Sequence, residues 1–212
     1  MDKIILTGAS STIGKRILLS NKTNKFKIFS QINTGKKIKK KNISYIKSNF
    51  LNDKSLNKFI KILLKQKIKY RSLIHLTSGK LNLKRFSEYE WEEVEEQIII
   101  QVKSLYKIMS TLYKQERLNN NFNLIVVSSY ITEKYNYPKG MSAYFLGKTL
   151  LENYIQVLKK EIVHTKVKFK IVKPKIFNSA IHSNLPNFYL EKNLKNKTKE
   201  LDITVRDIIK NL

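Results

Sequence analysis

The sequence contains no cysteine, no long apolar run and few arginines for a chain of its charge. The lack of cysteine excludes a disulfide framework and any metal site built on thiolates, so no metal is expected. No apolar run approaches the roughly 20 residues that a membrane-spanning helix needs, so no membrane association is expected. Met1 to Thr7 lead straight into a strand-like segment, which argues against a signal peptide. We therefore expect a cytoplasmic protein.

The chain is strongly basic, with 42 lysines and arginines against 16 acidic residues and a net charge of +26. Such a charge raises the hypothesis of nucleic-acid binding. Only five of the basic residues are arginines, whereas proteins that read nucleic acids rely on the bidentate contacts of arginine. Lysine, isoleucine and asparagine are all abundant, and A+T-rich codons produce this bias without any partner. Nucleic acid is therefore not an expected partner.

The length of 212 residues and a hydrophobic fraction of 42% suit one α/β domain over residues 1–212. Short apolar runs alternate with longer amphipathic stretches, which is typical of a βα series. We predict strands at Lys3–Thr7, Phe26–Ser30, Ile43–Ser48, Ser72–Leu76, Asn123–Ser128 and Val167–Val172. The helices are predicted at Ile13–Leu19, Asp53–Lys65, Ser87–Lys114, Ala143–Glu161 and Thr204–Leu212. This pattern predicts a doubly wound, Rossmann-type, mostly parallel sheet in the order 3-2-1-4-5-6, with helices on both faces.

A glycine-containing turn joins the first strand to the first helix at Thr7–Gly14. Glycines in such a turn let a pyrophosphate approach the backbone and the positive end of the helix. The turn resembles the Thr-Gly-x-x-x-Gly-x-Gly signature of the short-chain dehydrogenase/reductase family, with Thr12 in place of the middle glycine. The resemblance implies an NAD(P)(H)-dependent oxidoreductase. It also implies cofactor contacts from Gly8, Ser10, Ser11, Thr12, Ile13 and Gly14.

The end of the second strand bears on the choice between NAD(H) and NADP(H). An acidic residue there would bind the ribose 2′-hydroxyl and exclude a 2′-phosphate. The candidates are Ser30 and Gln31, neither of which is acidic, and Lys36 and Lys37 follow in the next loop. We take Ser30 as the contact residue and favour NADP(H) over NAD(H).

Tyrosine and lysine four residues apart on a helix lie on one face, where the ammonium can lower the phenol pKa for acid–base catalysis. Three such pairs occur: Tyr130/Lys134, Tyr135/Lys139 and Tyr144/Lys148. The first two fall in a stretch that reads as a loop because it contains Tyr137-Pro138 and Gly140. The third opens an amphipathic helix after the fifth strand, where the resemblance places Tyr-x-x-x-Lys. We therefore select Tyr144 and Lys148 as catalytic residues that also contact the cofactor.

The resemblance assigns further roles along most of the chain. Ser129 aligns with the serine that polarises the substrate carbonyl, and Gln101 with the asparagine that holds a proton-relay water. Because glutamine has the same hydrogen-bonding groups on a longer arm, the relay is either kept or lost. Additional cofactor contacts are expected from Asn49, Phe50, Leu76, Thr77, Pro174, Ile176 and Ser179. His75, at the end of an apolar strand, is expected to be structural.

These residues predict transfer of hydride between nicotinamide and a small carbonyl or alcohol substrate, with a Ser-Tyr-Lys site. The alternative is a catalytically inactive dinucleotide-binding regulatory protein of the same fold, suggested by the departures at Thr12 and Gln101. Lysines in the segment Ala180–Lys199, where the family has its substrate lid, suggest an anionic substrate: Lys192, Lys195, Lys197 and Lys199. By resemblance we also expect a homo-oligomer.

Overall fold

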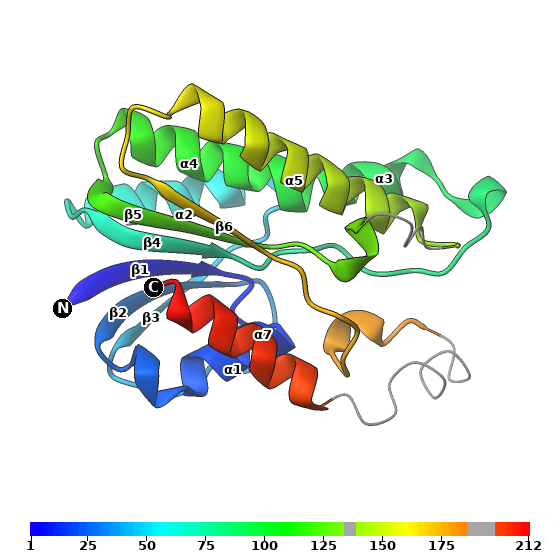
Figure 1. Ribbon diagram of the computed structural model, residues 1–212, viewed down its shortest axis with the longest axis horizontal. Coiled ribbons are helices and arrows are strands. Elements are labelled where there is room, and N and C mark those ends of the chain that lie inside the picture. Colours follow the sequence, from blue (N-terminus) through cyan, green and yellow to red (C-terminus); the bar gives the residue numbers. More distant parts are fainter. Residues whose placement is uncertain (134–138, 186–197) are drawn as a thin grey trace.

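The computed structural model describes residues 1–133, 139–185 and 198–212, and its centre is one six-stranded sheet. The strands are β1 (Asp2–Thr7), β2 (Phe26–Ile32), β3 (Ile43–Lys47), β4 (Tyr70–His75), β5 (Leu118–Val127) and β6 (Lys168–Val172). All five neighbouring pairs are parallel, and the order is β3-β2-β1-β4-β5-β6. The predicted order is confirmed, and the sheet is parallel throughout (Figure 1).

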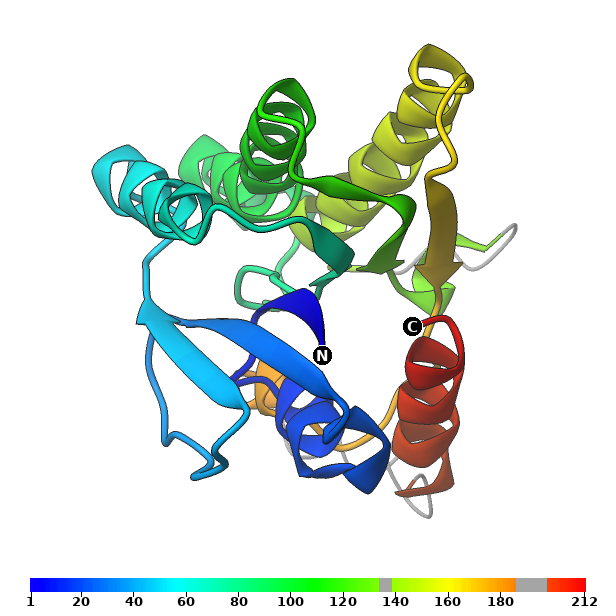
Figure 2. The same ribbon diagram turned by 90° about the vertical axis from the view of Figure 1, so that its left-hand side faces the viewer.

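Helices cover both faces of the sheet (Figure 2). One face carries α2 (Asp53–Lys65), α4 (Ser104–Lys114) and α5 (Ser142–Glu161), and the other carries α1 (Thr12–Leu19) and α7 (Thr198–Lys210). Because strand side chains alternate between faces, each face has its own core. Ile5, Leu73 and Leu124 belong to the first core, and Ile4, Ile74 and Ile125 to the second. No helix in the described ranges is both long and apolar enough to span a membrane.

The long helix predicted at Ser87–Lys114 is interrupted in the structure. A short 3-10 turn (Phe86–Glu88) precedes α3 (Trp91–Ile98), and a π-helical turn (Ile99–Lys103) joins α3 to α4. A π-turn inserts one extra residue into the helix and frequently marks a functional site. The apolar periodicity of the sequence continues across this point, so it did not predict the interruption.

The last helix begins at Thr198, six residues before its predicted start at Thr204. Its first three residues, Thr198, Lys199 and Glu200, are polar, so an apolar pattern did not reveal where the helix begins. Arg16 on α1 lies 2.8 Å from Asp202 in an exposed ion pair, and Val205 and Ile208 pack into the second core. These contacts hold α7 beside α1, as Figures 1 and 2 both show.

Candidate active site

The turn Thr7–Gly14 lies at the carboxyl end of β1, where doubly wound sheets bind ligands. Gly8 has a φ of +67°, and a Cβ added there would lie 3.1–3.2 Å from atoms of Leu76 and Thr77. A Cβ on Gly14 would lie 2.7 Å from the Gly8 carbonyl oxygen and 2.8 Å from Ala9 backbone atoms. Both positions therefore require glycine, and the turn is held tightly against the end of β4.

Side chains fix the shape of this turn. Ser11 caps α1 by accepting a 3.0 Å hydrogen bond from the Gly14 amide. Gln31, at the end of β2, accepts a 2.8 Å bond from the Gly8 amide and donates a 2.6 Å bond to the Ser48 carbonyl. No sequence pattern predicted this role for Gln31. The positive end of α1 is thereby presented beside a rigid backbone, an arrangement suited to a pyrophosphate.

Ser30 lies near the end of β2. It is 0% exposed, and its Oγ has no hydrogen-bond partner among the described residues. Both faces of β2 are covered, so neither side-chain direction leads to solvent at this position. The Ser30 side chain is therefore covered in this structure, and a contact between Ser30 and a cofactor stays a prediction. The loop after β2 also reaches the turn, since a Cβ on Gly35 would lie 3.2 Å from Ser10 Cβ.

Ser129, Tyr144 and Lys148 come together at the carboxyl end of β5. Ser129 lies close enough to Tyr144 to act on its phenol, and Lys148 Nζ lies 5.5 Å from the centre of the Tyr144 ring. Lys148 is only 2% exposed, and its Nζ donates a 2.9 Å hydrogen bond to the Val127 carbonyl. The three residues selected from the sequence thus form one contiguous group.

Burial sets the charge of this group. It raises the pKa of the Tyr144 phenol to about 12, although the nearby Ser129 side chain acts in the opposite direction. It lowers the pKa of the Lys148 ammonium to about 7, while the nearby Glu152 carboxylate raises it. Tyr144 is therefore a neutral phenol able to donate a proton, and Lys148 changes charge near neutral pH.

Gln101 lies in the π-turn and is fully buried against α5. Its Nε2 donates a 2.7 Å hydrogen bond to Gln97 Oε1, and its Oε1 has no partner among the described residues. A Cβ on Gly147 would lie 2.7 Å from Gln101 Nε2, so the glycine between Tyr144 and Lys148 makes room for the longer amide. The unpartnered Oε1 is an acceptor that an ordered water would satisfy.

His75 connects three parts of the site. Its Nδ1 lies 3.0 Å from Thr7 Oγ1, and its Nε2 lies 3.0 Å from both Thr77 Oγ1 and the Gln101 carbonyl oxygen. Burial lowers the pKa of His75 to about 3, so the ring is neutral in the folded protein. The ring ties the ends of β1 and β4 to the π-turn, as expected of a structural histidine.

His75 should make the protein less stable in acid. The unfolded chain binds a proton at the ordinary histidine pKa of 6.5, whereas the folded chain does not until about pH 3. Stability is therefore full above pH 6.5 and falls as the pH drops through this window, by about 2 kcal/mol between pH 7 and 5. In His75→Asn, urea unfolding should show a pH dependence reduced by about this amount. The exposed His164→Asn is the control, and an equal reduction in both variants would contradict the assignment.

Glu152 is a member of the group that the sequence did not reveal. It lies one helical turn after Lys148 and accepts hydrogen bonds from Ser128 Oγ and from Thr132 Oγ1. Its Oε2 pairs with Lys173 Nζ at 2.7 Å. The spacing of four residues from Lys148 was the available signal. Glu152 therefore interacts with Lys148 through its charge. It also binds Ser128 and Thr132 after β5 and Lys173 after β6.

The other residues that the sequence predicts to contact the cofactor follow strands of the same sheet, at the carboxyl ends of those strands. Leu76 and Thr77 are buried beside Gly8, and Thr77 Oγ1 donates a 3.0 Å bond to the Ile100 carbonyl. Asn49 is exposed after β3, while the Phe50 side chain packs in the core against Phe59 and so is not available to a ligand.

The segment after β6 also lies beside this group. The carbonyl of Pro174 accepts a 3.0 Å bond from the Tyr130 amide, and Ser179 Oγ lies 3.4 Å from His182 Nδ1. Ile176 is half-buried between them in the chain. The segment that follows β6 therefore lies against Tyr130, which is the residue after Ser129.

Several sequence predictions fall outside the described residues. Lys134, from the pair Tyr130/Lys134, and Tyr135, from the pair Tyr135/Lys139, both lie in 134–138. Lys192, Lys195 and Lys197, which suggested an anionic substrate, lie in 186–197. Lys199 is described and exposed.

Comparison with known proteins gives a consistent result. A family model described as short chain dehydrogenase matches residues 2–189. No curated protein sequence matches the chain. Among solved structures, a short chain dehydrogenase family protein from Francisella tularensis subsp. tularensis SCHU S4 has a TM-score of 0.77 and 17% identity. That match covers 91% of this chain and 76% of the other.

Two further structures have named activities. A 3-ketoacyl-(acyl-carrier-protein) reductase from Brucella melitensis, complexed with NADH, gives a TM-score of 0.73 at 12% identity, over 86% of this chain and 78% of that one. A serine dehydrogenase from Escherichia coli gives 0.71 at 16% identity, over 83% of each chain. At these identities the likeness shows a shared fold.

Proposed function

Because the chain belongs to the short-chain dehydrogenase family, we propose that it transfers hydride between a nicotinamide cofactor and a small carbonyl or alcohol substrate. The observation that carries the proposal is the contiguous group of Ser129, Tyr144 and Lys148 beside a glycine turn that leaves no room for side chains. A protein that only bound a dinucleotide would have no need of a buried lysine next to a tyrosine.

In the proposed reaction, the bound nicotinamide supplies or accepts the hydride. Ser129 donates a hydrogen bond to the substrate oxygen and holds it next to the Tyr144 hydroxyl. Tyr144 gives its proton to that oxygen during reduction and takes it back during oxidation. The Lys148 ammonium stabilises the phenolate that remains, because opposite charges favour the ionised form.

Gln101 is proposed to keep the proton relay rather than to lose it. Its buried, unpartnered Oε1 and its contact with the helix turn between Tyr144 and Lys148 support a water held at this point. The π-turn contributes by directing this residue inward, toward α5. After each reduction Lys148 would pass a proton to the Tyr144 phenolate, and such a water would then replace the proton on the lysine.

NADP(H) is the proposed cofactor, in preference to NAD(H). No carboxylate occupies the end of β2, and Gly35 brings the start of the lysine-rich loop to Ser10 of the glycine turn. Lys36 follows Gly35 directly and is exposed, so its ammonium is available to a 2′-phosphate. Cofactor contacts are proposed for Gly8, Ser10, Ser11, Thr12, Ile13 and Gly14.

Fluorescence titration with NADPH and NADH, followed by turnover assays on oxo-sugars and oxo-acyl compounds, tests this function. We expect tighter binding of NADPH and consumption of cofactor that depends on the carbonyl compound. Lys36→Gln should weaken NADPH binding and leave NADH binding unchanged, whereas Lys47→Gln, an exposed charge change on β3, should affect neither. Equal affinity for both cofactors in the unmodified protein would contradict the NADP(H) preference.

Glu152 is proposed as a positioning residue for Lys148. Glu152→Gln keeps the size and the acceptor for Ser128 but removes the charge that raises the Lys148 pKa. The alkaline limb of the kcat/KM profile should therefore move to lower pH, since the lysine would lose its proton earlier. Glu161→Gln, exposed at the end of the same helix, is the control. An unmoved limb in Glu152→Gln would remove Glu152 from the mechanism.

A homo-oligomer is also proposed. Apolar side chains remain substantially exposed on α4 and α5: Tyr106, Tyr113, Leu146, Leu150 and Val157. A contiguous exposed apolar surface is typical of a protein interface. Sedimentation analysis should show more than one chain per particle, and a monomer at micromolar concentration would refute the proposal.

A further inference from the structure

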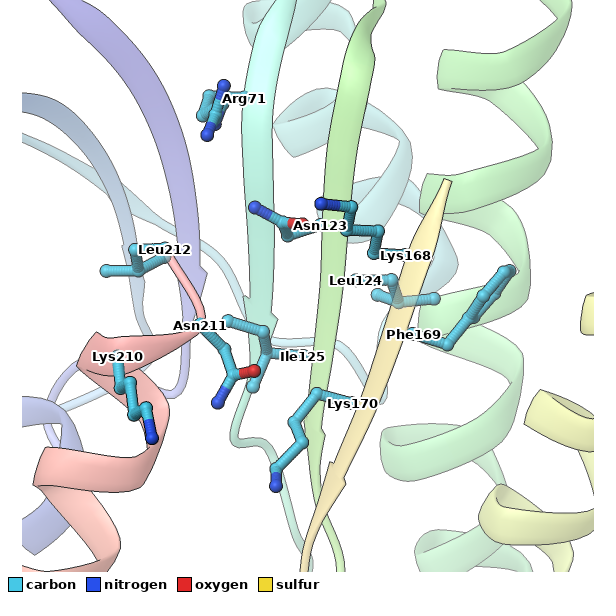
Figure 3. Close-up of a pocket in the computed structure, with 10 residues that line it drawn as sticks. All are labelled: Arg71, Asn123, Leu124, Ile125, Lys168, Phe169, Lys170, Lys210, Asn211 and Leu212. Atoms are coloured by element: carbon cyan, nitrogen blue, oxygen red, sulfur yellow. The ribbon is translucent and has the colours of Figure 1, made fainter. Parts of the chain in front are cut away.

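A polar cavity of about 250 Å³ lies on the α7 side of the sheet, away from the glycine turn. Its walls come from β4, β5, β6 and the end of α7 (Figure 3). Asn123, which lines the cavity, is paired in register with Lys168 at the start of β6. Val127 lies four residues further along β5, at the end of the strand that leads to Ser129. At about 3.3 Å per residue the two places are more than 10 Å apart along β5. The cavity is therefore separate from the candidate active site.

Two polar side chains that line this cavity, and one on the strand beside it, lack hydrogen-bond partners in the part of the chain that the structure describes. Arg71 Nε is buried without a partner, and so is Ser72 Oγ on the same strand. The Asn123 side chain, 9% exposed, lines the cavity and forms no side-chain hydrogen bond with a described residue. Ser72 is the register partner of Asn123 on β4, so the two side chains share a face of the sheet. All three groups are able to donate a hydrogen bond.

The charge around the cavity is strongly positive. Arg71, Lys168, Lys170 and Lys210 line it, and Figure 3 shows these side chains coming from three separate elements. In the described ranges, one carboxylate pairs with this set: Asp207, whose Oδ2 lies 3.2 Å from Lys170 Nζ. Lys210, in the last turn of α7, offsets the negative end of the helix dipole. The other cations face the cavity without an acidic partner.

We propose that this cavity binds a small, multiply charged phosphate-type oxyanion. Unpartnered buried donors are costly, and an oxyanion satisfies several of them at once through charge-assisted hydrogen bonds. Arg71 matches the planar geometry of phosphate oxygens, and Lys168 and Lys210 contribute charge from opposite sides. The volume accommodates a pyrophosphate or the phosphate end of an organic ester. This site does not depend on the proposed oxidoreductase function.

Isothermal titration calorimetry with inorganic pyrophosphate tests the proposal. Binding to the unmodified protein is expected, with at least tenfold loss of affinity in Arg71→Gln and in Lys168→Gln. Lys168 is exposed, so its variant remains informative even if Arg71→Gln fails to fold. A parallel titration with a simple phosphate monoester separates a diphosphate site from one that takes the end of an organic ligand.

Two controls make the result decisive. Lys47→Gln removes the same charge on the far edge strand β3 and should bind pyrophosphate normally. An equal loss in Lys47→Gln and Lys168→Gln would show general attraction to a basic surface and overturn the proposal. Loss of binding in Gly14→Ala, with Lys168→Gln unaffected, would place the anion at the glycine turn and also overturn it. No measurable binding to the unmodified protein has the same consequence.

Discussion

Tyr144→Phe is expected to reduce kcat for carbonyl reduction by a factor on the order of 10²–10⁴, the usual contribution of a positioned general acid. The variant loses only the hydroxyl, which lies close to Ser129. The ring remains, and so does its contact with the Lys148 ammonium. Cofactor affinity should therefore be retained, so that the loss falls on the chemical step. Steady-state kinetics together with NADPH titration of the same preparation separates these effects.

The matched control is Tyr106→Phe, which removes a hydroxyl from an exposed tyrosine on α4. It should leave kcat within the error of the unmodified enzyme. If Tyr144→Phe reduces carbonyl compounds at the unmodified rate, then Tyr144 is not the proton donor, and the choice among the three Tyr/Lys pairs must be reopened.

Gly14→Ala is expected to weaken dinucleotide binding at least tenfold and to destabilise the fold by about 1–3 kcal/mol, the usual cost of overpacking. The added methyl group would lie 2.7 Å from the Gly8 carbonyl oxygen, so the turn must open. The atoms that it meets belong to backbone, which cannot move away as a flexible side chain can. Because the same backbone forms the proposed pyrophosphate site, stability and binding should fall together. Chemical denaturation and fluorescence titration measure the two effects.

Leu19→Ala is a suitable comparison, since it alters an exposed residue at the other end of α1. It should bind the cofactor normally. Normal binding by Gly14→Ala would mean that the turn is not the dinucleotide site, whatever its likeness to a family signature.

Much of the fold could be predicted from the sequence because its signals are local. Ile4, Ile5 and Leu6 form a continuous apolar run, as a strand buried on both faces requires, and Gly8 follows after Thr7. Such runs alternating with amphipathic stretches specify the strand order through the rules for parallel crossovers. Tyr144 and Lys148 could be selected for the same reason, since their helix and their place after β5 are visible in the pattern.

What could not be predicted depends on contacts between distant segments. The bond of Gln31 with the Gly8 amide and the links of His75 with the π-turn join residues 23 to 26 positions apart. No sequence pattern marks Gly147 as important, yet it packs against Gln101 from a different helical segment. The burial of Ser30 could not be predicted because a strand end beside a loop reads as exposed, whereas the fold covers both sides of it. Glu152 stands four residues after Lys148 in the sequence, but its contacts with Ser128 and Lys173 appear only in the fold.

The central claim is that the group of Ser129, Tyr144 and Lys148 carries out hydride transfer. The most direct test uses NADPH labelled with deuterium at nicotinamide C4 and mass analysis of the alcohol formed from a panel of carbonyl compounds. The account predicts deuterium on the product carbon with the unmodified protein and almost none with Tyr144→Phe at equal cofactor saturation. Tight NADPH binding without labelled product from any compound in the panel would contradict it and favour a regulatory dinucleotide-binding protein.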